Sequence, residues 1–185
     1  MSRGYVIKSR PHVLIELRPS EICGIGVFAA KPIQKNRKIA NGLAAEDFET
    51  LVSWKEGLKF DIAVRKKIQD FCIGTPRGFI PPENLDFNRL SIEWYLNHSC
   101  AGNVGFDRNG DFVAIRNIKK GQELTYDYGL AESNPRFVMR CMCRSRRCRR
   151  IITGNDWKRK DFRRGRTKHM LPQLRGKAGG LPSRP

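Results

Sequence analysis

The chain has 185 residues, of which 39% are hydrophobic and 29% are charged, and its formal net charge is +18. That length suits one domain with small appendages, and that composition excludes a coiled coil and a wholly disordered chain. The longest apolar run near the start, Val13-Leu14-Ile15, is too short for a secretory signal, and no stretch is long enough for a membrane span, so we expect an intracellular protein without membrane contact.

The positive charge is concentrated towards the end of the chain. Residues 136–185 hold 17 Lys or Arg and two acidic residues, whereas residues 1–135 hold 19 and 16. Such a local field attracts polyanions, and nucleic acid is the first candidate partner. The alternative is a solvated end that serves only solubility.

Short strands are predicted first, and helices after them. Residues 12–17 and 26–30 are rich in strand-forming side chains. Between about 44 and 72 the apolar residues recur every three or four positions, which predicts two short helices separated by Gly57. Residues 73–89 contain five Gly or Pro residues, which predicts a loop.

Strands resume after this loop. Residues 104–106 and 112–115 flank an Asn109-Gly110 pair, which is the strongest short-range signal for a hairpin. Residues 123–128 alternate and are rich in strand formers, so they predict a further strand. Apolar residues after position 157 are too sparse to bury a face, so residues 158–185 are predicted to form a disordered basic tail.

The cysteines indicate a metal site. Cys141, Cys143 and Cys148 form a C-x-C-x4-C cluster, which can place three thiolates on one ion, and tetrahedral zinc then needs a fourth ligand. The candidates for the fourth ligand are Cys100, Cys72 and Cys23. Disulfides are the alternative, but C-x-C is a poor pair for bridging its own sulfurs and the expected compartment is reducing.

Two segments and one bend carry a resemblance to a known family. The sequence NHSC at 97–100 precedes ELTYDYG at 123–129, and both follow GIG at 24–26. In order and spacing this series resembles the motifs of SET-domain lysine methyltransferases, and the C-x-C-x4-C cluster resembles their post-SET zinc segment. The resemblance implies a mainly β SET-domain fold, with small sheets around a pseudoknot. The implied parts are a SET domain over 1–130 with a helical insert at about 44–72, a post-SET zinc segment over 131–157, and the basic tail over 158–185.

The resemblance also implies a role for individual residues. The implied catalytic residues are Tyr128, which would orient the lysine amine, and Tyr126, which would limit the number of methyl groups added. The implied cofactor-binding residues are Gly24, Ile25, Gly26, Asn97, His98 and Trp157. The implied zinc ligands are Cys100, Cys141, Cys143 and Cys148. One tyrosine of the family's lysine channel has no counterpart at residues 40–42, and Tyr95 is the candidate to supply it.

The activity implied is transfer of a methyl group from S-adenosylmethionine to a lysine side chain of a basic protein, with mainly monomethyl-lysine as product. A histone or another nucleic-acid-associated protein is the expected substrate, and the acidic excess of residues 41–100 is expected to face it. The alternative is a catalytically silent SET module that binds nucleic acid or a protein partner through its basic C-terminal region. The expected location is the nucleus or chromosome in a eukaryote, and the cytoplasm or nucleoid in a prokaryote.

Overall fold

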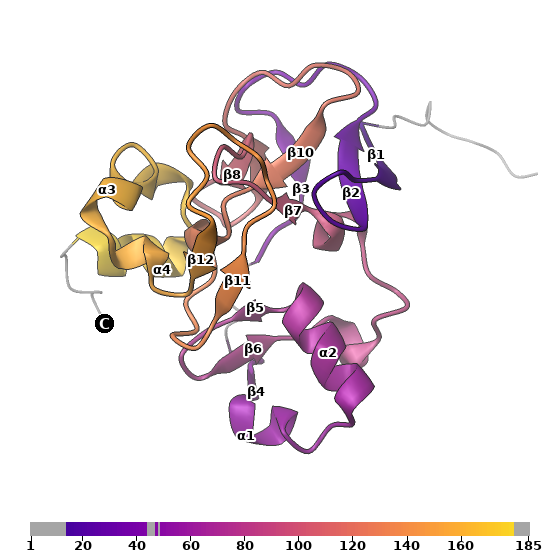
Figure 1. The fold of residues 1–185 in the computed structure, drawn as a ribbon, viewed down its shortest axis with the longest axis vertical. Helices are drawn as coiled ribbons and strands as arrows, with labels where there is room; N and C mark the ends of the chain where they lie inside the picture. The colour runs from indigo at the N-terminus through magenta and orange to yellow at the C-terminus, as the bar shows by residue number, and fades with distance from the viewer. Residues whose placement is uncertain (1–13, 44–46, 48, 180–185) are drawn as a thin grey trace, which may run out of the picture.

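The computed structural model describes residues 14–43, 47 and 49–179, and its largest sheet lies in the upper part of Figure 1. The strand order in this sheet is β1-β2-β10-β8-β9-β3, with β7 paired to β10. The strands are β1 (Ile15–Pro19), β2 (Ile25–Ala29), β3 (Lys38–Ala40), β7 (Asn97–His98), β8 (Val104–Phe106), β9 (Phe112–Ala114) and β10 (Glu123–Tyr126). The mainly β fold expected from the sequence is confirmed.

The central strand β10 brings the two sequence motifs together. It runs antiparallel to β2 and parallel to both β7 and β8. The register places Thr125 beside Asn97 and Tyr126 beside His98. The segments 97–100 and 123–129 therefore lie side by side, and a 3-10 turn over Tyr128–Leu130 follows the strand. Side chains that are fully or almost fully buried fill the space around β10, among them Val27, Val104, Phe106 and Leu124.

The insert forms a separate lobe at the bottom of Figure 1. Its sheet has the order β4-β6-β5. Its elements are β4 (Val52–Ser53), α1 (Trp54–Gly57), α2 (Ile62–Phe71), β5 (Ile73–Gly74) and β6 (Gly78–Ile80), followed by 3-10 turns over Glu83–Leu85 and Ile92–Tyr95. Ser53 caps α1 in a reciprocal capping box with Glu56, and Asp61 caps α2 by accepting the N–H of Val64.

The second predicted helix of the insert is confirmed, but two other predictions there need correction. The first helix begins only at Trp54, because Val52 pairs with Phe79 in a strand, and Phe48 lies outside the described residues. The predicted loop at 73–89 contains β5 and β6. Glycine permits this pairing, since a Cβ atom on Gly78 would lie 2.1 Å from the Val52 carbonyl oxygen.

The predicted hairpin is confirmed, with β8 antiparallel to β9 and a positive φ of 89° at Gly110. A second hairpin, β11 (Val138–Arg140) and β12 (Ile151–Thr153), carries the cysteine cluster in its loop. In Figure 1 this hairpin lies between the insert and the C-terminal helices.

The prediction of a disordered tail is wrong for residues 158–179. This segment holds a 3-10 turn over Asp156–Lys158, α3 (Lys160–Arg163), a turn over Thr167–His169 and α4 (Pro172–Gly179). Its few apolar side chains are buried in the main core: Phe162, Met170, Leu171 and Leu174. Arg175 also donates to the carbonyls of Met170 and Phe106. These four apolar side chains are enough to order the segment, because they pack into the existing main core and do not have to form a separate core.

Within the described part of the chain, no helix is long and apolar enough to cross a membrane.

Candidate active site and metal centre

Four cysteines converge at the β11–β12 loop. The sulfurs of Cys100, Cys141, Cys143 and Cys148 all lie within 4.8 Å of one another. The sulfurs of Cys100 and Cys141 are 3.8 Å apart, whereas a disulfide needs about 2.05 Å. Ligands at about 2.3 Å from a tetrahedral zinc ion lie about 3.8 Å from each other, so this cluster fits zinc.

Backbone N–H groups point at three of these sulfurs. The N–H of Arg149 donates to Cys100, that of Arg150 to Cys148 and that of Cys143 to Cys141, at distances of 3.3, 3.3 and 3.5 Å. Such donors stabilise the thiolate form, which is the form that binds a metal.

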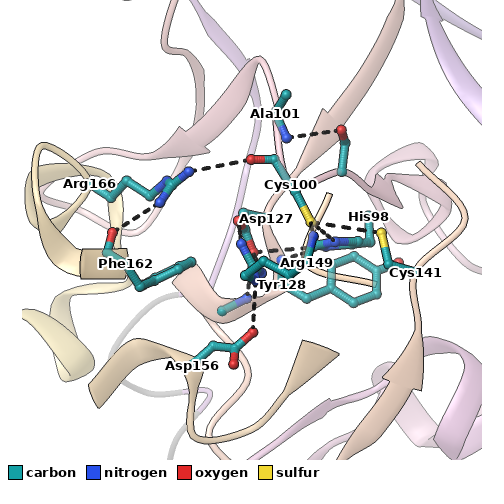
Figure 2. Close-up of polar contacts among 12 residues, drawn as sticks. His98, Cys100, Ala101, Asp127, Tyr128, Cys141, Arg149, Asp156, Phe162 and Arg166 are labelled. Atoms are coloured by element: carbon teal, nitrogen blue, oxygen red, sulfur yellow. Dashed lines mark hydrogen bonds and ion pairs between the residues drawn. The ribbon is translucent and has the colours of Figure 1, made fainter. Parts of the chain in front are cut away.

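The imidazole of His98 joins the cysteine cluster to Tyr128 (Figure 2). Its Nδ1 accepts the backbone N–H of Tyr128 at 3.1 Å. The proton therefore sits on Nε2, which lies 3.4 Å from the sulfur of Cys100 and donates to it. Burial lowers the pKa of His98 to about 4, so the ring is neutral near pH 7.

A buried ion pair supports the same region from the other side. Arg149 donates two hydrogen bonds of 2.6 Å to Asp127 and one of 3.1 Å to Asp156. Asp127 also accepts the N–H of Gly129, which caps the 3-10 turn that begins with Tyr128. Figure 2 shows Arg149 between the two carboxylates.

Two cavities meet at Tyr128. The larger, of about 900 Å³, is lined by Gly24, Ile25, Asn97 and His98, among others. The smaller, of about 420 Å³, is lined by Tyr126. Tyr128 and Leu96 line both, so the structure puts Tyr128 where contents of one cavity can reach those of the other.

Asn97 fixes the edge of the larger cavity. Its side-chain amide donates to the carbonyls of Cys23 and Ile25 at 3.0 and 3.2 Å, and to the carboxylate of Glu123 at 3.0 Å. These bonds hold the loop that contains Gly24, whose φ of 48° suits glycine and whose Cβ position is open space.

Two residues expected at the cofactor site, Gly26 and Trp157, do not line either cavity. Gly26 is the neighbour of Ile25 in β2, and a Cβ atom there would lie 2.3 Å from the Glu123 carboxylate oxygen, so a larger residue would displace that side chain. Trp157 also lines neither cavity, because it packs against the main core.

The rings of Tyr126 and Tyr128 pack against each other at a tilt of 43°, with centroids 4.9 Å apart. Burial raises the pKa of both hydroxyls, so both are protonated near neutral pH. The Tyr128 hydroxyl donates to the carbonyl of Leu96 at 3.2 Å. Tyr95, expected to complete the channel, lines the larger cavity instead and packs on Phe71.

Comparison with known proteins assigns the family. The model of the SET domain family matches residues 24–129, which is more than half of the chain. The chain belongs to the SET-domain family. A SET domain transfers methyl groups from S-adenosylmethionine to lysine, so the enzyme class and the cofactor expected from the motifs are those of the family.

Relatives of this SET domain are named as histone-lysine N-methyltransferases. It is 40% identical over 152 residues to human Histone-lysine N-methyltransferase 2D, covering 74% of this chain and 2% of that protein. It is 32% identical over 143 residues to the Caenorhabditis briggsae protein named Probable histone-lysine N-methyltransferase set-23, covering 70% of this chain and 56% of that one. The chain thus spans at most about half the length of these relatives.

A solved structure also aligns, though too weakly to add to the assignment. It is a humanized mutant of Chaetomium thermophilum Polycomb Repressive Complex 2 bound to the inhibitor GSK126. The alignment has a TM-score of 0.46 and 24% identity, and it covers 65% of this chain and 15% of that one.

Three residues of this SET-domain site were missed by sequence reasoning. Trp94 and Phe112 supply aromatic walls to the smaller cavity, and Glu132 lines both cavities. The sequence around Trp94 and Phe112 does not distinguish an aromatic residue that lines a cavity from one that is buried in the core. Glu132 follows Leu130 and Ala131 just after the ELTYDYG segment and precedes Ser133 and Asn134, so the sequence gives no signal that it is buried.

Proposed function

We propose that this SET domain methylates a lysine side chain of a basic protein, with a histone tail as the first candidate, and that it adds mainly one methyl group. The observation that carries the proposal is the position of Tyr128 at the junction of the two cavities. One cavity would take the cofactor and the other the lysine, so that the two reactants meet in line.

The charges that line the cavities support this division. Beside one arginine, Arg89, the smaller cavity is lined by carboxylates that suit a basic peptide: Asp47, Glu83, Glu93 and Glu132. The larger cavity is lined by cations that suit the carboxylate of the cofactor: Lys66, Lys67, Arg136 and Arg140. Asp70 and Glu132 border both cavities, and Asp70 is paired with Lys66 at 3.1 Å.

The residues of the site have distinct tasks in this proposal. The cofactor, when bound through Gly24, Ile25, Asn97 and the backbone at His98, supplies a methyl group on a positive sulfur. The Tyr128 hydroxyl, whose pKa burial raises further above neutral pH, stays protonated and orients the lysine nitrogen. The aromatic walls exclude water and thereby favour the neutral amine over the ammonium form.

A zinc ion on the four cysteines would hold segment 97–100 against the β11–β12 loop. In that position its chemistry is structural, because all four ligand positions of the tetrahedron are filled by protein. The carbonyl of Leu96 and the backbone of Tyr128 then keep their places on either side of His98.

Mass spectrometry of histones and histone peptides after incubation with isotopically labelled S-adenosylmethionine tests the function. We expect a labelled methyl group on lysine with the wild-type chain and much less label with Tyr128→Phe. A chain that binds the cofactor in a calorimetric titration but labels none of these substrates would favour the silent SET module.

We propose nucleic acid as a second partner. Its basis is a set of exposed cations in the zinc loop and in the C-terminal segment: Arg144, Arg146, Arg147, Arg150, Lys158, Lys160, Arg164 and Lys168. Such a field attracts phosphates and would place the enzyme on chromatin.

The matching test avoids truncation, because residues 158–179 contribute core side chains. Substituting Lys158, Lys160, Arg164 and Lys168 by Gln should lower the slope of log affinity for DNA against log salt by up to about four, at roughly 0.9 per phosphate contact. Methylation of a free peptide should be unchanged. If the slope of log affinity against log salt is unaltered, these four cations do not contact DNA phosphates.

A further inference from the structure

One carboxylate has an unusual place in this site. Two acidic residues line both cavities, Asp70 and Glu132. Asp70 is exposed and paired with Lys66, whereas Glu132 is only 6% exposed. Among the described residues, Glu132 is thus the only buried carboxylate that borders both cavities, a position that it shares with Tyr128.

The backbone holds Glu132 in this position. Its own N–H donates to the carbonyl of Tyr128 at 2.7 Å. One carboxylate oxygen accepts the N–H of Gly74 at 2.8 Å and the other accepts that of Asn134 at 2.7 Å. A Cβ atom on Gly74 would lie 2.8 Å from this carboxylate, so glycine keeps the space open. The side chain is therefore fixed relative to Tyr128.

The surrounding groups leave the charge of this carboxylate uncompensated. No basic side chain within residues 14–43, 47 and 49–179 lies at ion-pair distance from Glu132. The titratable groups around it are the Tyr126 and Tyr128 hydroxyls, the Cys72 thiol and, across the cavities, Asp70, Glu93, Lys66, Lys67 and Arg136. Burial raises the pKa of Glu132 to about 7, and its backbone donors only partly oppose this.

We propose that Glu132 accepts the proton of the substrate lysine before methyl transfer, an inference that rests on the proposed function. An N–H bond of the ammonium group breaks and an O–H bond forms on the Glu132 carboxyl. The nitrogen keeps the electron pair, and the two opposite charges cancel inside the cavity. The proton returns to water when product leaves.

The chemistry explains why such an acceptor is useful here. The free lysine pKa of about 10.4 leaves roughly one amine in a thousand neutral near pH 7. A proton acceptor works best when its own pKa lies near the working pH, and an ordinary exposed glutamate is too acidic for that. Transfer to Glu132 removes one positive charge beside a site that must also hold a cationic cofactor.

Single-turnover rates of methyl transfer, measured from pH 6 to pH 10 at saturating S-adenosylmethionine and histone peptide, test the proposal. The wild-type rate should rise to about pH 7 and then level off. In Glu132→Gln the rate should be lower at pH 7 by about 10²-fold or more, a typical effect of a general base. It should then rise tenfold per pH unit and approach the wild-type rate near pH 10.

Asp70→Asn is the matched control, because it neutralises the other carboxylate that borders both cavities. It should keep the wild-type pH profile. A second probe is a peptide with thialysine in place of lysine, since thialysine carries a less basic amine. The deficit of Glu132→Gln at pH 7 should be smaller with this peptide than with the lysine peptide.

The outcomes separate the two proposals. Suppose that the wild-type enzyme is active and that Glu132→Gln lowers the methyl-transfer rate by the same factor at every pH. Glu132 is then only structural, and the proton-acceptor role is overturned. The proton-acceptor role is also overturned if Glu132→Gln loses the same fraction of its rate at pH 7 with the lysine peptide and with the thialysine peptide. A wild-type chain that methylates no peptide at any pH overturns the proposed function, and the role of Glu132 falls with it.

Discussion

Arg149 and Asp127 form a bidentate ion pair, with both nitrogen–oxygen distances at 2.6 Å. The pair connects the residue that follows the last cysteine of the cluster to the residue that precedes Tyr128. The guanidinium also lies over the ring of Phe162, 5.1 Å from its centroid. The C-terminal segment, the β11–β12 loop and the 3-10 turn that begins with Tyr128 are therefore joined through one side chain.

Replacing Arg149 should lower the stability of the folded chain. In Arg149→Ala the buried carboxylates of Asp127 and Asp156 lose their counter-charge, so we expect a loss of about 3–5 kcal/mol in the free energy of unfolding, measured with urea. Arg149→Lys should lose stability too, because a point charge cannot make the paired hydrogen bonds. Arg159→Ala, which breaks the exposed pair with Asp161, is the control and should change little.

The metal centre is tested by zinc analysis. We expect one zinc per chain in the wild type and a large loss of bound zinc in Cys100→Ser, because the cluster then lacks its ligand from segment 97–100. Cys72→Ser should keep its zinc, since Cys72 lies outside the cluster. Undiminished zinc in Cys100→Ser would rule out this ligand set.

The role of Tyr128 is tested by separating binding from turnover. Tyr128→Phe removes the hydroxyl that bonds to the Leu96 carbonyl but keeps the ring that packs on His98 and Tyr126. We expect most of the turnover to disappear while the dissociation constant for S-adenosylmethionine stays nearly the same. Wild-type rates in this variant would contradict the assignment.

The number of methyl groups should depend on Tyr126. Its buried ring packs against Phe106, Phe112 and Tyr128, which hold it in place on the wall of the smaller cavity. Tyr126→Phe removes a hydroxyl and makes room for a methylated amine, and mass spectrometry should show a shift from monomethyl-lysine to di- and trimethyl-lysine. Trimethyl-lysine as the main wild-type product would refute this.

The ionisation of Glu132 should also appear in the pH dependence of stability. Its folded pKa of about 7 lies above the ordinary value of 4.5, so its contribution to stability is complete below pH 4.5 and is lost as the pH rises through 7. Relative to Glu132→Gln, the wild type should lose about 3 kcal/mol of unfolding free energy over this interval. Parallel stability curves for the two proteins would contradict the raised pKa.

The sequence alone was sufficient for the family resemblance, for the elements with strong local signals and for three of the four cysteines of the cluster. The hairpin at residues 104–114 follows from its Asn-Gly turn, and α2 follows from its apolar spacing, because both are local signals that neighbouring residues decide. The C-x-C-x4-C spacing likewise predicts three thiols on one ion without knowledge of the fold.

Tertiary contacts alone decided the order of the C-terminal segment and the environments of Glu132 and Gly26. The tail reads as disordered because its apolar residues are few, yet Phe162, Met170, Leu171 and Leu174 are buried in a core formed by distant strands. Glu132 gains its raised pKa from burial between two cavities, and Gly26 lies against Glu123, which is far away in sequence. Burial and close approach are properties of segments that meet in space, so no window of sequence contains them.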